Sequence, residues 1–297
     1  MSFVKKLIPI KLKQAIKNSI TVEPTRVKAD YIVSISNQKA FAGKNVLVTG
    51  GTGAIGSAIC QRLYAEGAIV GVGGRNKKKL GATVRQMEKN IGDLPGKGEL
   101  HQIVIDVTDS QSISDGVDDF VNKVGKLDVF INVAGGSSRQ LNKPQHEQDI
   151  DLIDSVLNTN LRGTILGCRK AAQVMVKQKS GKIINMSSIV GINGKKNFSD
   201  YAAAKAGIIG YTKSLALELG EYGITVNCVA PGGIIQVPFD AGVPEIKVET
   251  SSIGRLGYTD EVANLVEFIA SPKADYITGQ IFIIDGGRSL GLMGDKA

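Results

Sequence analysis

The chain has 297 residues, 42% of them hydrophobic and 22% charged, a balance that excludes general disorder and a fibrous repeat. Its three cysteines, Cys60, Cys168 and Cys228, are widely spaced and odd in number, which excludes a disulfide framework; two histidines argue against a multi-histidine metal site, so no metal is expected. The net charge of +8 does not predict nucleic-acid binding, because residues 1–44 carry nine Lys/Arg and two Asp/Glu, whereas the rest of the chain carries 27 and 26.

Residues 1–20 form a basic segment in which five lysines interrupt apolar positions and no acid occurs. A secretory signal needs an unbroken apolar stretch, which these lysines prevent. Two interpretations stay open: a solvated or loosely docked tail, and a short amphipathic segment resting on an anionic membrane surface or a partner. We expect residues 1–41 to be a basic N-terminal extension and residues 42–297 to form one domain. No run of 18 apolar residues occurs, so no membrane-spanning helix is expected.

From Lys44 onwards, short apolar runs typical of buried strands alternate with stretches of helical spacing. The expected strands are 45–49, 69–72, 102–107, 129–133, 182–186, 225–229 and 280–284. The expected helices are 56–67, 76–90, 110–124, 149–177, 200–222 and 259–270. Strands that are apolar on both faces and alternate with helices predict a parallel sheet covered on both sides. Right-handed connections then make it a doubly wound, seven-stranded α/β sheet of the Rossmann type.

The first expected strand runs directly into a glycine-rich loop, Thr49–Gly56 (TGGTGAIG), which opens a helix. Without Cβ atoms the backbone can approach a pyrophosphate, and a helix N-terminus offers free N–H groups and a partial positive charge. No Gly-Lys-Ser/Thr follows, which disfavours an ATP-type phosphate loop. The loop therefore predicts a dinucleotide site with contacts from Gly50, Thr52, Gly53 and Ile55, and an ordinary tight turn is the alternative.

The second expected strand ends at Gly73-Gly74-Arg75, followed by Asn76 and three lysines. In NAD-selective folds an acid at this place grips the ribose hydroxyls, and none is present here. Arg75 suits a 2′-phosphate, because its guanidinium offers a fork of donors. The sequence thus favours NADP(H), with NAD(H) possible. After the third strand, Asp106-Val107 lies where an adenine could lie; Asp106 either accepts a hydrogen bond from its exocyclic amine or caps the next helix.

Tyr201 and Lys205 have a spacing that places both side chains on one face of an expected helix, about 6 Å apart. A free tyrosine titrates near 10, and a neighbouring ammonium favours the phenolate and so lowers the tyrosine pKa. Ser188 ends the fifth expected strand, and chemistry in parallel sheets gathers at the carboxyl ends of strands. The hydroxyl of Ser188 and the phenol of Tyr201 could therefore flank one carbonyl oxygen.

With these motifs in this order, the chain resembles the short-chain dehydrogenase/reductase family, in its short single-domain branch, over about residues 42–290. The motifs that carry the resemblance are Thr49–Gly56, Asp106-Val107, Asn132-Val133-Ala134-Gly135, Asn158–Leu161, Ser188, Tyr201 to Lys205, Pro231-Gly232 and Asp285-Gly286-Gly287.

The resemblance implies roles for four residues. Tyr201 would be the general acid/base, and Lys205 would lower its pKa and bind the nicotinamide ribose. Ser188 would hydrogen-bond the substrate oxygen, and Asn160 would hold a water in a proton relay behind Lys205. A hydride would pass between the nicotinamide and the substrate carbonyl carbon. Besides the residues of the glycine loop, Arg75 and Asp106-Val107, the expected cofactor contacts are Asn132, Ala134, Gly135, Tyr201, Lys205, Pro231, Gly232 and Ile234.

Three positions depart from the family pattern. Ala54 stands where the short branch has glycine, and the loop's glycines match the spacing of the extended branch, which contains sugar-nucleotide epimerases and dehydratases. Only 92 residues follow Lys205, however, which leaves little room for a separate substrate domain. Gln236 replaces a threonine that often contacts the nicotinamide amide, and Val133 replaces the second asparagine of Asn-Asn-Ala-Gly, a change expected to be tolerated.

The expected substrate is a small carbonyl compound or alcohol: a keto-sugar, a polyol or an acyl-thioester. Segment 233–254 is expected to form a lid, with Phe239 and Val243 as lining. Basic residues in the other two rim loops either attract an anionic substrate or are scattered solvated charge. These residues are Arg139, Lys143, Lys195 and Lys196.

Two other functions stay open: a nucleotide-sugar epimerase or dehydratase that retains NAD, and a non-catalytic dinucleotide-binding regulatory protein. The resemblance also implies a homodimer or homotetramer, with helices 149–177 and 200–222 pairing across one two-fold axis and residues 279–292 across another. The cysteine pattern fits a reducing compartment, so a cytoplasmic location is expected.

Overall fold

The computed structural model describes residues 25–26, 32–33, 39–137, 141, 143–235 and 251–290. The basic segment 1–20, for which a solvated tail and a membrane- or partner-contacting segment were both open, lies outside the described residues, as does most of the expected lid. The same holds for Arg139, Gln236, Phe239 and Val243.

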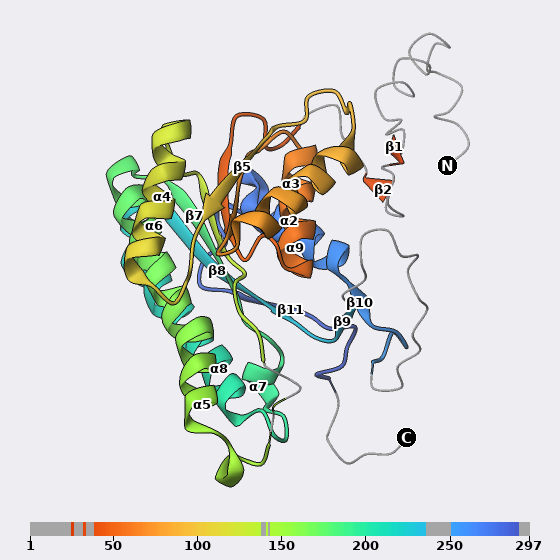
Figure 1. The fold of residues 1–297 in the computed structure, drawn as a ribbon, viewed down its shortest axis with the longest axis vertical. Coiled ribbons are helices and arrows are strands. Elements are labelled where there is room, and N and C mark those ends of the chain that lie inside the picture. Colours follow the sequence, from red (N-terminus) through yellow and green to blue (C-terminus); the bar gives the residue numbers. More distant parts are fainter. Residues whose placement is uncertain are drawn as a thin grey trace, which may run out of the picture.

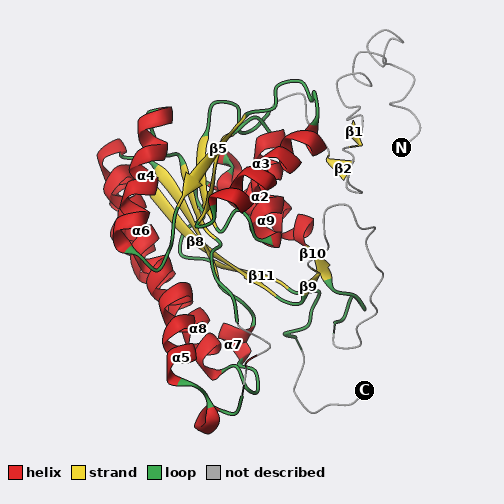
Figure 2. Ribbon diagram, in the orientation of Figure 1, coloured by secondary structure: helices red, strands yellow, loops and turns green. Residues whose placement is uncertain are grey.

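A seven-stranded parallel sheet forms the centre of the molecule (Figures 1 and 2), with the strand order β11-β8-β7-β6-β3-β4-β5. The strands are β3 (Asn45–Thr49), β4 (Ile69–Gly74), β5 (Glu99–Val104), β6 (Val129–Asn132), β7 (Gly181–Met186), β8 (Ile224–Pro231) and β11 (Ile281–Ile284). The strand order reverses next to β3, which makes the sheet doubly wound. The predicted Rossmann architecture is confirmed.

Helices cover both faces of the sheet (Figure 1), with α2, α3 and α9 on one side and α4, α6 and α8 on the other. The first set is α2 (Ala54–Ala65), α3 (Lys77–Ile91) and α9 (Thr259–Ala270). The second set is α4 (Ser110–Val124), α6 (Gly163–Gln178) and α8 (Ser199–Leu219). Helix α5 (Ile150–Leu157) and the π-helical turn η4 (Asn158–Arg162) lead into α6.

Strand β3 shows why the strands are apolar throughout: all five of its residues are buried. Val46 and Val48 point into the core under α2 and α9, whereas Leu47 joins the core on the opposite face with Phe130. Successive strand side chains alternate between faces, so both faces need apolar residues when both are covered. Each such fully buried side chain contributes about 2 kcal/mol.

Strand β5 begins and ends three residues earlier than the predicted strand 102–107. It pairs with β4 alone, from Ile69↔Glu99 to Gly74↔Val104, and its outer side is exposed. Ile105 and Val107, which extended the apolar run in the sequence, are buried in the loop that follows the strand. The predicted strand was therefore wrong at both ends, because Ile105 and Val107 are buried without being paired in the sheet.

The remaining elements are short. They are β1 (Thr25–Arg26), β2 (Ile32–Val33), β9 (Ile234–Ile235), β10 (Gly257–Tyr258), α7 (Val190–Asn193) and the 3-10 turns η3 (Gln145–Glu147), η5 (Gly220–Tyr222) and η6 (Pro272–Ala274). Strands β9 and β10 pair in parallel, so the start of the expected lid segment 233–254 is joined to the chain just beyond its end.

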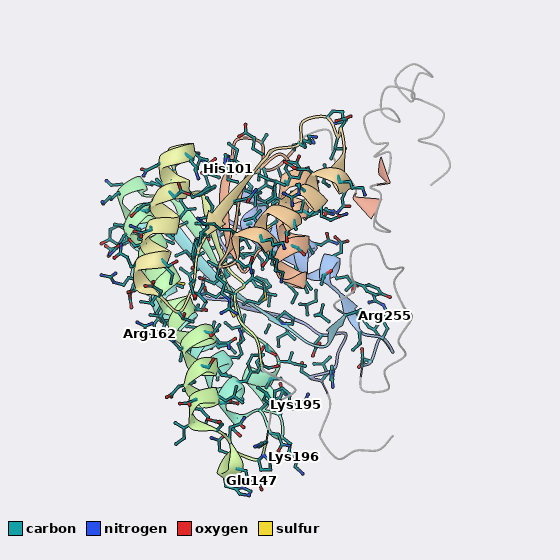
Figure 3. All side chains as sticks on the ribbon, viewed as in Figure 1. His101, Glu147, Arg162, Lys195, Lys196 and Arg255 are labelled. Atoms are coloured by element: carbon teal, nitrogen blue, oxygen red, sulfur yellow. The ribbon has the colours of Figure 1, made fainter. Side chains whose placement is uncertain are left out.

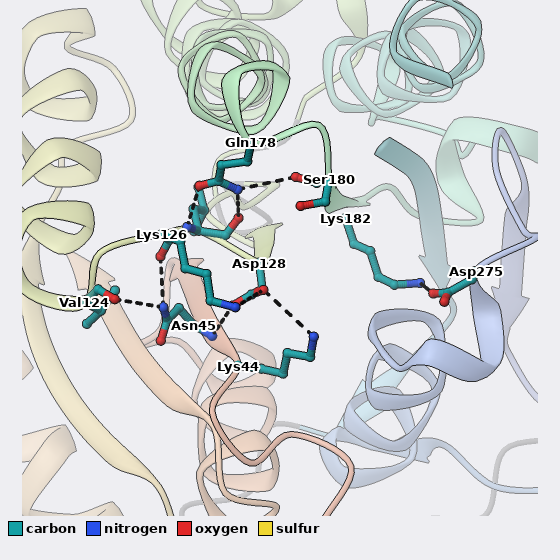
Figure 4. A network of polar contacts seen from close by, with 10 residues as sticks. Lys44, Asn45, Val124, Lys126, Asp128, Gln178, Ser180, Lys182 and Asp275 are labelled. Carbon is teal, nitrogen blue, oxygen red and sulfur yellow. Dashed lines mark hydrogen bonds and ion pairs between the residues drawn. The ribbon is translucent and has the colours of Figure 1, made fainter. Parts of the chain in front are cut away.

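The amino edge of the sheet is closed by polar contacts (Figure 4). The Asp128 carboxylate accepts a hydrogen bond from the Asn45 backbone N–H (2.8 Å) and pairs with Lys126 (2.9 Å). The Gln178 amide bonds both backbone groups of Leu127, at 3.0 and 2.9 Å. The polar groups at the amino edge are thus bound to one another, and a ligand site is expected at the opposite edge, where the carboxyl ends of the strands lie.

Within the described part of the chain, no helix is long and apolar enough to cross a membrane. No group of three or more His, Cys, Asp or Glu side chains that could hold a metal ion occurs in the same residues.

Candidate active site

The glycine-rich loop is packed too closely for side chains. Gly50 has φ +69°, and a Cβ there would lie 2.7 Å from the Ala134 Cα. A Cβ on Gly56 would lie 2.2 Å from the Gly50 carbonyl oxygen. That same oxygen accepts a hydrogen bond from the Gly53 N–H at 2.9 Å. The glycines therefore hold a tight turn that brings bare backbone to the start of α2.

Helix α2 begins at Ala54, and its N-cap residue Gly53 makes no side-chain capping bond. The first N–H groups of the helix thus point outward without a capping side chain, at the positive end of its dipole. Thr52 and Ile55 flank this point and are half-buried. Such a bare, uncapped helix start fits the pyrophosphate of a dinucleotide.

Arg75 follows β4 at the same edge and is exposed. The Asn76 side chain caps α3 by accepting a hydrogen bond from the Lys79 N–H (2.9 Å). This cap holds the exposed lysines Lys77 and Lys78 beside Arg75, at the start of α3. The arrangement is cationic and open to solvent, as an anion site for a 2′-phosphate requires.

Asp106 is held by Thr108, whose backbone N–H (3.0 Å) and hydroxyl (2.7 Å) both donate to its carboxylate. These bonds, with a smaller contribution from the nearby Arg75, lower the pKa of Asp106. The alternative that Asp106 caps the next helix is wrong, because the cap of α4 is Asp109, which accepts from the Gln111 N–H at 2.8 Å.

Asn132 has a buried side chain that is used within the protein. Its amide nitrogen donates to the Asn185 side chain (2.9 Å) and to the Cys168 sulfur (3.2 Å). Asn185 in turn donates to the Thr212 hydroxyl (3.0 Å). The Asn132 amide nitrogen is therefore engaged within the protein, and a cofactor contact by Asn132 stays a prediction. The Ala134 N–H donates to the Thr49 hydroxyl at 3.4 Å. The sequence carried no signal for this buried chain of polar groups.

Tyr201 and Lys205 share one face of α8, as their spacing predicts. The Lys205 Nζ lies 5.5 Å from the centre of the Tyr201 ring. Lys205 is 4% exposed and donates to the Met186 carbonyl oxygen at 2.9 Å. Burial lowers the pKa of the Lys205 ammonium to about 8. The Tyr201 ring packs edge-on against Phe198, with 6.4 Å between ring centres.

Asn160 lies in the π-helical turn and is fully buried. Its side chain donates to the Gly136 carbonyl (2.9 Å) and accepts from the Gly136 N–H (3.1 Å), a two-way clamp on the chain beyond β6. A Cβ added at Gly135 would lie 2.4 Å from Asn160 Oδ1 and 3.4 Å from Lys205 Nζ. Asn160 and Lys205 therefore meet at Gly135. The π turn interrupts the predicted helix 149–177, and such turns often occur at functional sites.

Ser188 follows β7 and is 9% exposed, and its hydroxyl accepts a hydrogen bond from the Val190 N–H (3.2 Å). The next residue, Ile189, donates its N–H to the Pro231 carbonyl at 3.1 Å, which ties this turn to the end of β8. Gly232 follows Pro231, and a Cβ there would lie 2.6 Å from the Asp285 Cβ. Half-buried Ile234 begins β9. The four residues expected to be catalytic thus lie around one edge of the sheet.

Two residues that the sequence analysis did not single out support this arrangement. The Ser187 hydroxyl donates to the Lys205 carbonyl oxygen (2.8 Å) and anchors α8 to β7. Asp200 is 6% exposed and accepts a hydrogen bond from the Tyr201 N–H (2.7 Å). Their signal in the sequence was only adjacency to Ser188 and Tyr201. Lys143 is exposed, as are Lys195 and Lys196 (labelled in Figure 3). The Lys195 Nζ lies 4.2 Å from the centre of the Phe198 ring.

Comparison with known proteins decides the family. A family model described as enoyl-(acyl carrier protein) reductase matches residues 50–289. The chain belongs to the short-chain dehydrogenase/reductase family. It is therefore an NAD(P)-dependent oxidoreductase that acts on carbonyl and CH–OH groups.

Several curated relatives of this dehydrogenase/reductase carry one name. The 3-oxoacyl-(acyl-carrier-protein) reductase of Thermotoga maritima is 40% identical over 249 residues, which covers 82% of this chain and 97% of the relative. The protein of the same name from Staphylococcus aureus is 38% identical over 248 residues, with the same coverage.

Solved structures agree on the fold. A short-chain dehydrogenase/reductase from Mycobacterium ulcerans superposes with a TM-score of 0.77 at 29% identity, covering 84% of this chain and 90% of that one. A 3-oxoacyl-(acyl-carrier protein) reductase from Brucella melitensis with bound NAD superposes with a TM-score of 0.76 at 30% identity, covering 89% and 99%.

Proposed function

We propose that this enzyme reduces the 3-oxo group of an acyl thioester to a hydroxyl group, with NADPH as the favoured reductant. The observation that carries the proposal is the near full-length similarity to proteins named 3-oxoacyl-(acyl-carrier-protein) reductase. The placement of Ser188, Tyr201, Lys205 and Asn160 around one edge of the sheet supports it. Keto-sugars and polyols, which the sequence left open, are less favoured because none of these relatives is named for them.

Tyr201 and Ser188 would both hydrogen-bond the oxygen of the substrate carbonyl. A nicotinamide cofactor, when bound, would supply the hydride for the carbonyl carbon. As the carbon–oxygen double bond becomes single, Tyr201 gives its proton to the oxygen, and the product is the alcohol. Ser188 is suited to hold the oxygen because the bond from Val190 N–H to its hydroxyl leaves the Ser188 proton free to donate.

Lys205 would favour proton release from Tyr201, and Asn160 would help to return a proton to it. The buried Lys205 ammonium, 5.5 Å from the centre of the Tyr201 ring, would stabilise the phenolate left after proton transfer. Asn160 clamps Gly136 with its side chain, and its Oδ1 and the Lys205 Nζ both lie beside Gly135, a place from which Asn160 could order a water for reprotonation.

The experiment is an assay of NADPH oxidation with two thioesters of equal length, acetoacetyl-pantetheine and crotonyl-pantetheine. Reduction of the 3-oxo compound is expected, and reduction of the enoyl compound is not. The enoyl compound is the matched control because the family model is described by an enoyl reductase. Turnover of crotonyl-pantetheine alone would overturn the proposal. No turnover of either, with NAD retained through purification, would favour the nucleotide-sugar epimerase or dehydratase.

Replacing Arg75 with Ala is expected to raise the KM for NADPH at least about ten-fold and that for NADH less than about two-fold. The guanidinium can bond the 2′-phosphate, which NADPH carries and NADH lacks. No acidic residue stands at this place to bind the ribose hydroxyls of NADH. Steady-state kinetics with both cofactors measure the difference, and Arg85→Ala, an exposed arginine of α3, is the control. Equal losses for both cofactors would show that Arg75 does not read the phosphate.

We also propose that the enzyme is a homodimer or homotetramer in the cytoplasm. Exposed apolar side chains on two faces support self-association: Leu217 on α8 is 86% exposed, and Ile283 on β11 is 47% exposed. An apolar groove with Ile192 and Ile281 in its lining runs between α7, α8 and β11. These faces include the helix 200–222 and the segment 279–292 that the family resemblance nominates.

A further inference from the structure

The chain turns sharply after β11 and holds Arg288 in a defined place. The Asp285 carboxylate accepts hydrogen bonds from the N–H groups of Gly287 (2.9 Å) and Ser289 (2.6 Å), on both sides of Arg288. Gly286 has φ +64° and Gly287 φ +79°, a conformation that favours glycine. The Ser251 hydroxyl fastens the turn from outside by donating to the Gly286 carbonyl at 3.0 Å.

The Arg288 guanidinium lies against the backbone at Gly233, where an added Cβ would be 3.0 Å from its Nη1. The side chain is exposed and makes no hydrogen bond or ion pair with any residue that the structure describes. The other arginine of this region, Arg255 (Figure 3), is already bound: it makes two bonds to Glu261, at 2.9 and 2.7 Å, and lies over the Tyr258 ring. The backbone at Arg288 is therefore held by the turn, and its guanidinium has no hydrogen-bond or ion-pair partner among the described residues.

Its position is beside the substrate side of the site. Strand β11 pairs with β8, and β8 pairs with β7, after which Ser188 follows. Neighbouring strands lie about 4.8 Å apart, so the end of β11 is roughly 10 Å from that of β7 along the sheet. The glycine loop follows β3, four strands from β11, or roughly 19 Å away. By strand spacing, Arg288 therefore lies nearer to Ser188 than to the glycine loop, where the cofactor pyrophosphate is expected.

We propose that Arg288 binds the phosphate of the pantetheine-type arm that carries the acyl thioester, and so selects phosphorylated carriers. This inference rests on the proposed function. Guanidinium and phosphate form charge-assisted bonds with two donors on two oxygens, which suits an exposed arginine beside the substrate side of the site. The phosphate sits at the far end of the arm from the thioester, so Arg288 acts on binding and leaves the reacting carbonyl to Ser188 and Tyr201.

The test compares two substrates that differ by one phosphate, acetoacetyl-4′-phosphopantetheine and acetoacetyl-pantetheine. Arg288→Met is expected to raise the KM for the phosphorylated substrate about ten-fold, with kcat unchanged, and to leave both constants for the other substrate unchanged. Arg288→Lys keeps the charge but loses the fork of donors, so an intermediate KM is expected. Lys89→Met is the control, because Lys89 is an exposed cation in the last turn of α3, at the opposite edge of the sheet.

Equal changes for both substrates, or no change for either, would overturn the assignment of Arg288. A raised KM for NADPH in Arg288→Met would also overturn it, since Arg288 would then bind a phosphate of the cofactor and not of the substrate. If the unmodified enzyme reduces neither thioester, the proposed function fails, and calorimetric titration with 4′-phosphopantetheine still decides the inference. Binding that is lost in Arg288→Met and kept in Lys89→Met would support it; equal binding by all three proteins would refute it.

Discussion

Replacing Tyr201 with Phe is expected to lower turnover at least about 10²-fold while leaving cofactor affinity nearly unchanged. The substitution removes only the hydroxyl. The ring keeps its edge-on packing against Phe198 and its place 5.5 Å from the Lys205 ammonium. Without the hydroxyl, the oxygen of the substrate has no proton donor when the hydride arrives, and Ser188 alone holds it.

The measurement is kcat together with a fluorescence titration of NADPH. Tyr276→Phe is the matched control, because Tyr276 is fully exposed at the surface and should tolerate the same loss of a hydroxyl. Unchanged turnover in Tyr201→Phe would remove Tyr201 from the mechanism. A large loss of NADPH affinity would instead mean that the hydroxyl is mainly a binding group.

Replacing Lys205 with Met is expected to lower turnover by about 10²-fold or more and to change how stability depends on pH. The ammonium is 4% exposed, and its removal takes away the charge that stabilises the Tyr201 phenolate. Burial holds the pKa of Lys205 at about 8, below its ordinary value of 10.5. Below pH 8 the folded protein therefore buries a charge that the unfolded chain keeps hydrated.

The direction of the pH effect follows from proton binding. Between pH 8 and 10.5 the unfolded chain binds the Lys205 proton more tightly than the folded protein does, so the free energy of unfolding of the unmodified enzyme rises with pH. Relative to Lys205→Met, the unmodified enzyme should gain stability across this range. Urea unfolding at pH 7 and pH 10 measures it, with Lys89→Met, an exposed lysine of α3, as control. If the free energy of unfolding changed with pH in the same way for all three proteins, Lys205 would not have a pKa lowered by burial.

Most of the architecture was predictable, because it depends on short-range patterns. Apolar runs of strand length that alternate with stretches of helical spacing are typical of a parallel sheet with helices on both faces. Val46 and Leu47 illustrate this, because they pack into the cores on opposite faces of the sheet. The error at 102–107 arose because Ile105 and Val107 are buried under a loop beyond β5. An apolar run reports burial, and hydrogen-bonded pairing decides where a strand ends.

The candidate site divides in the same way. The sequence alone determined the uncapped glycine loop, the cation at Arg75 and the one-turn spacing of Tyr201 and Lys205, since each is a relation between residues close along the chain. Only the tertiary structure decided that the Asn132 amide is spent on Asn185 and Cys168, or that Arg288 lies against Gly233 without a partner among the described residues. Those contacts join segments far apart in sequence, and no local periodicity encodes which of them meet.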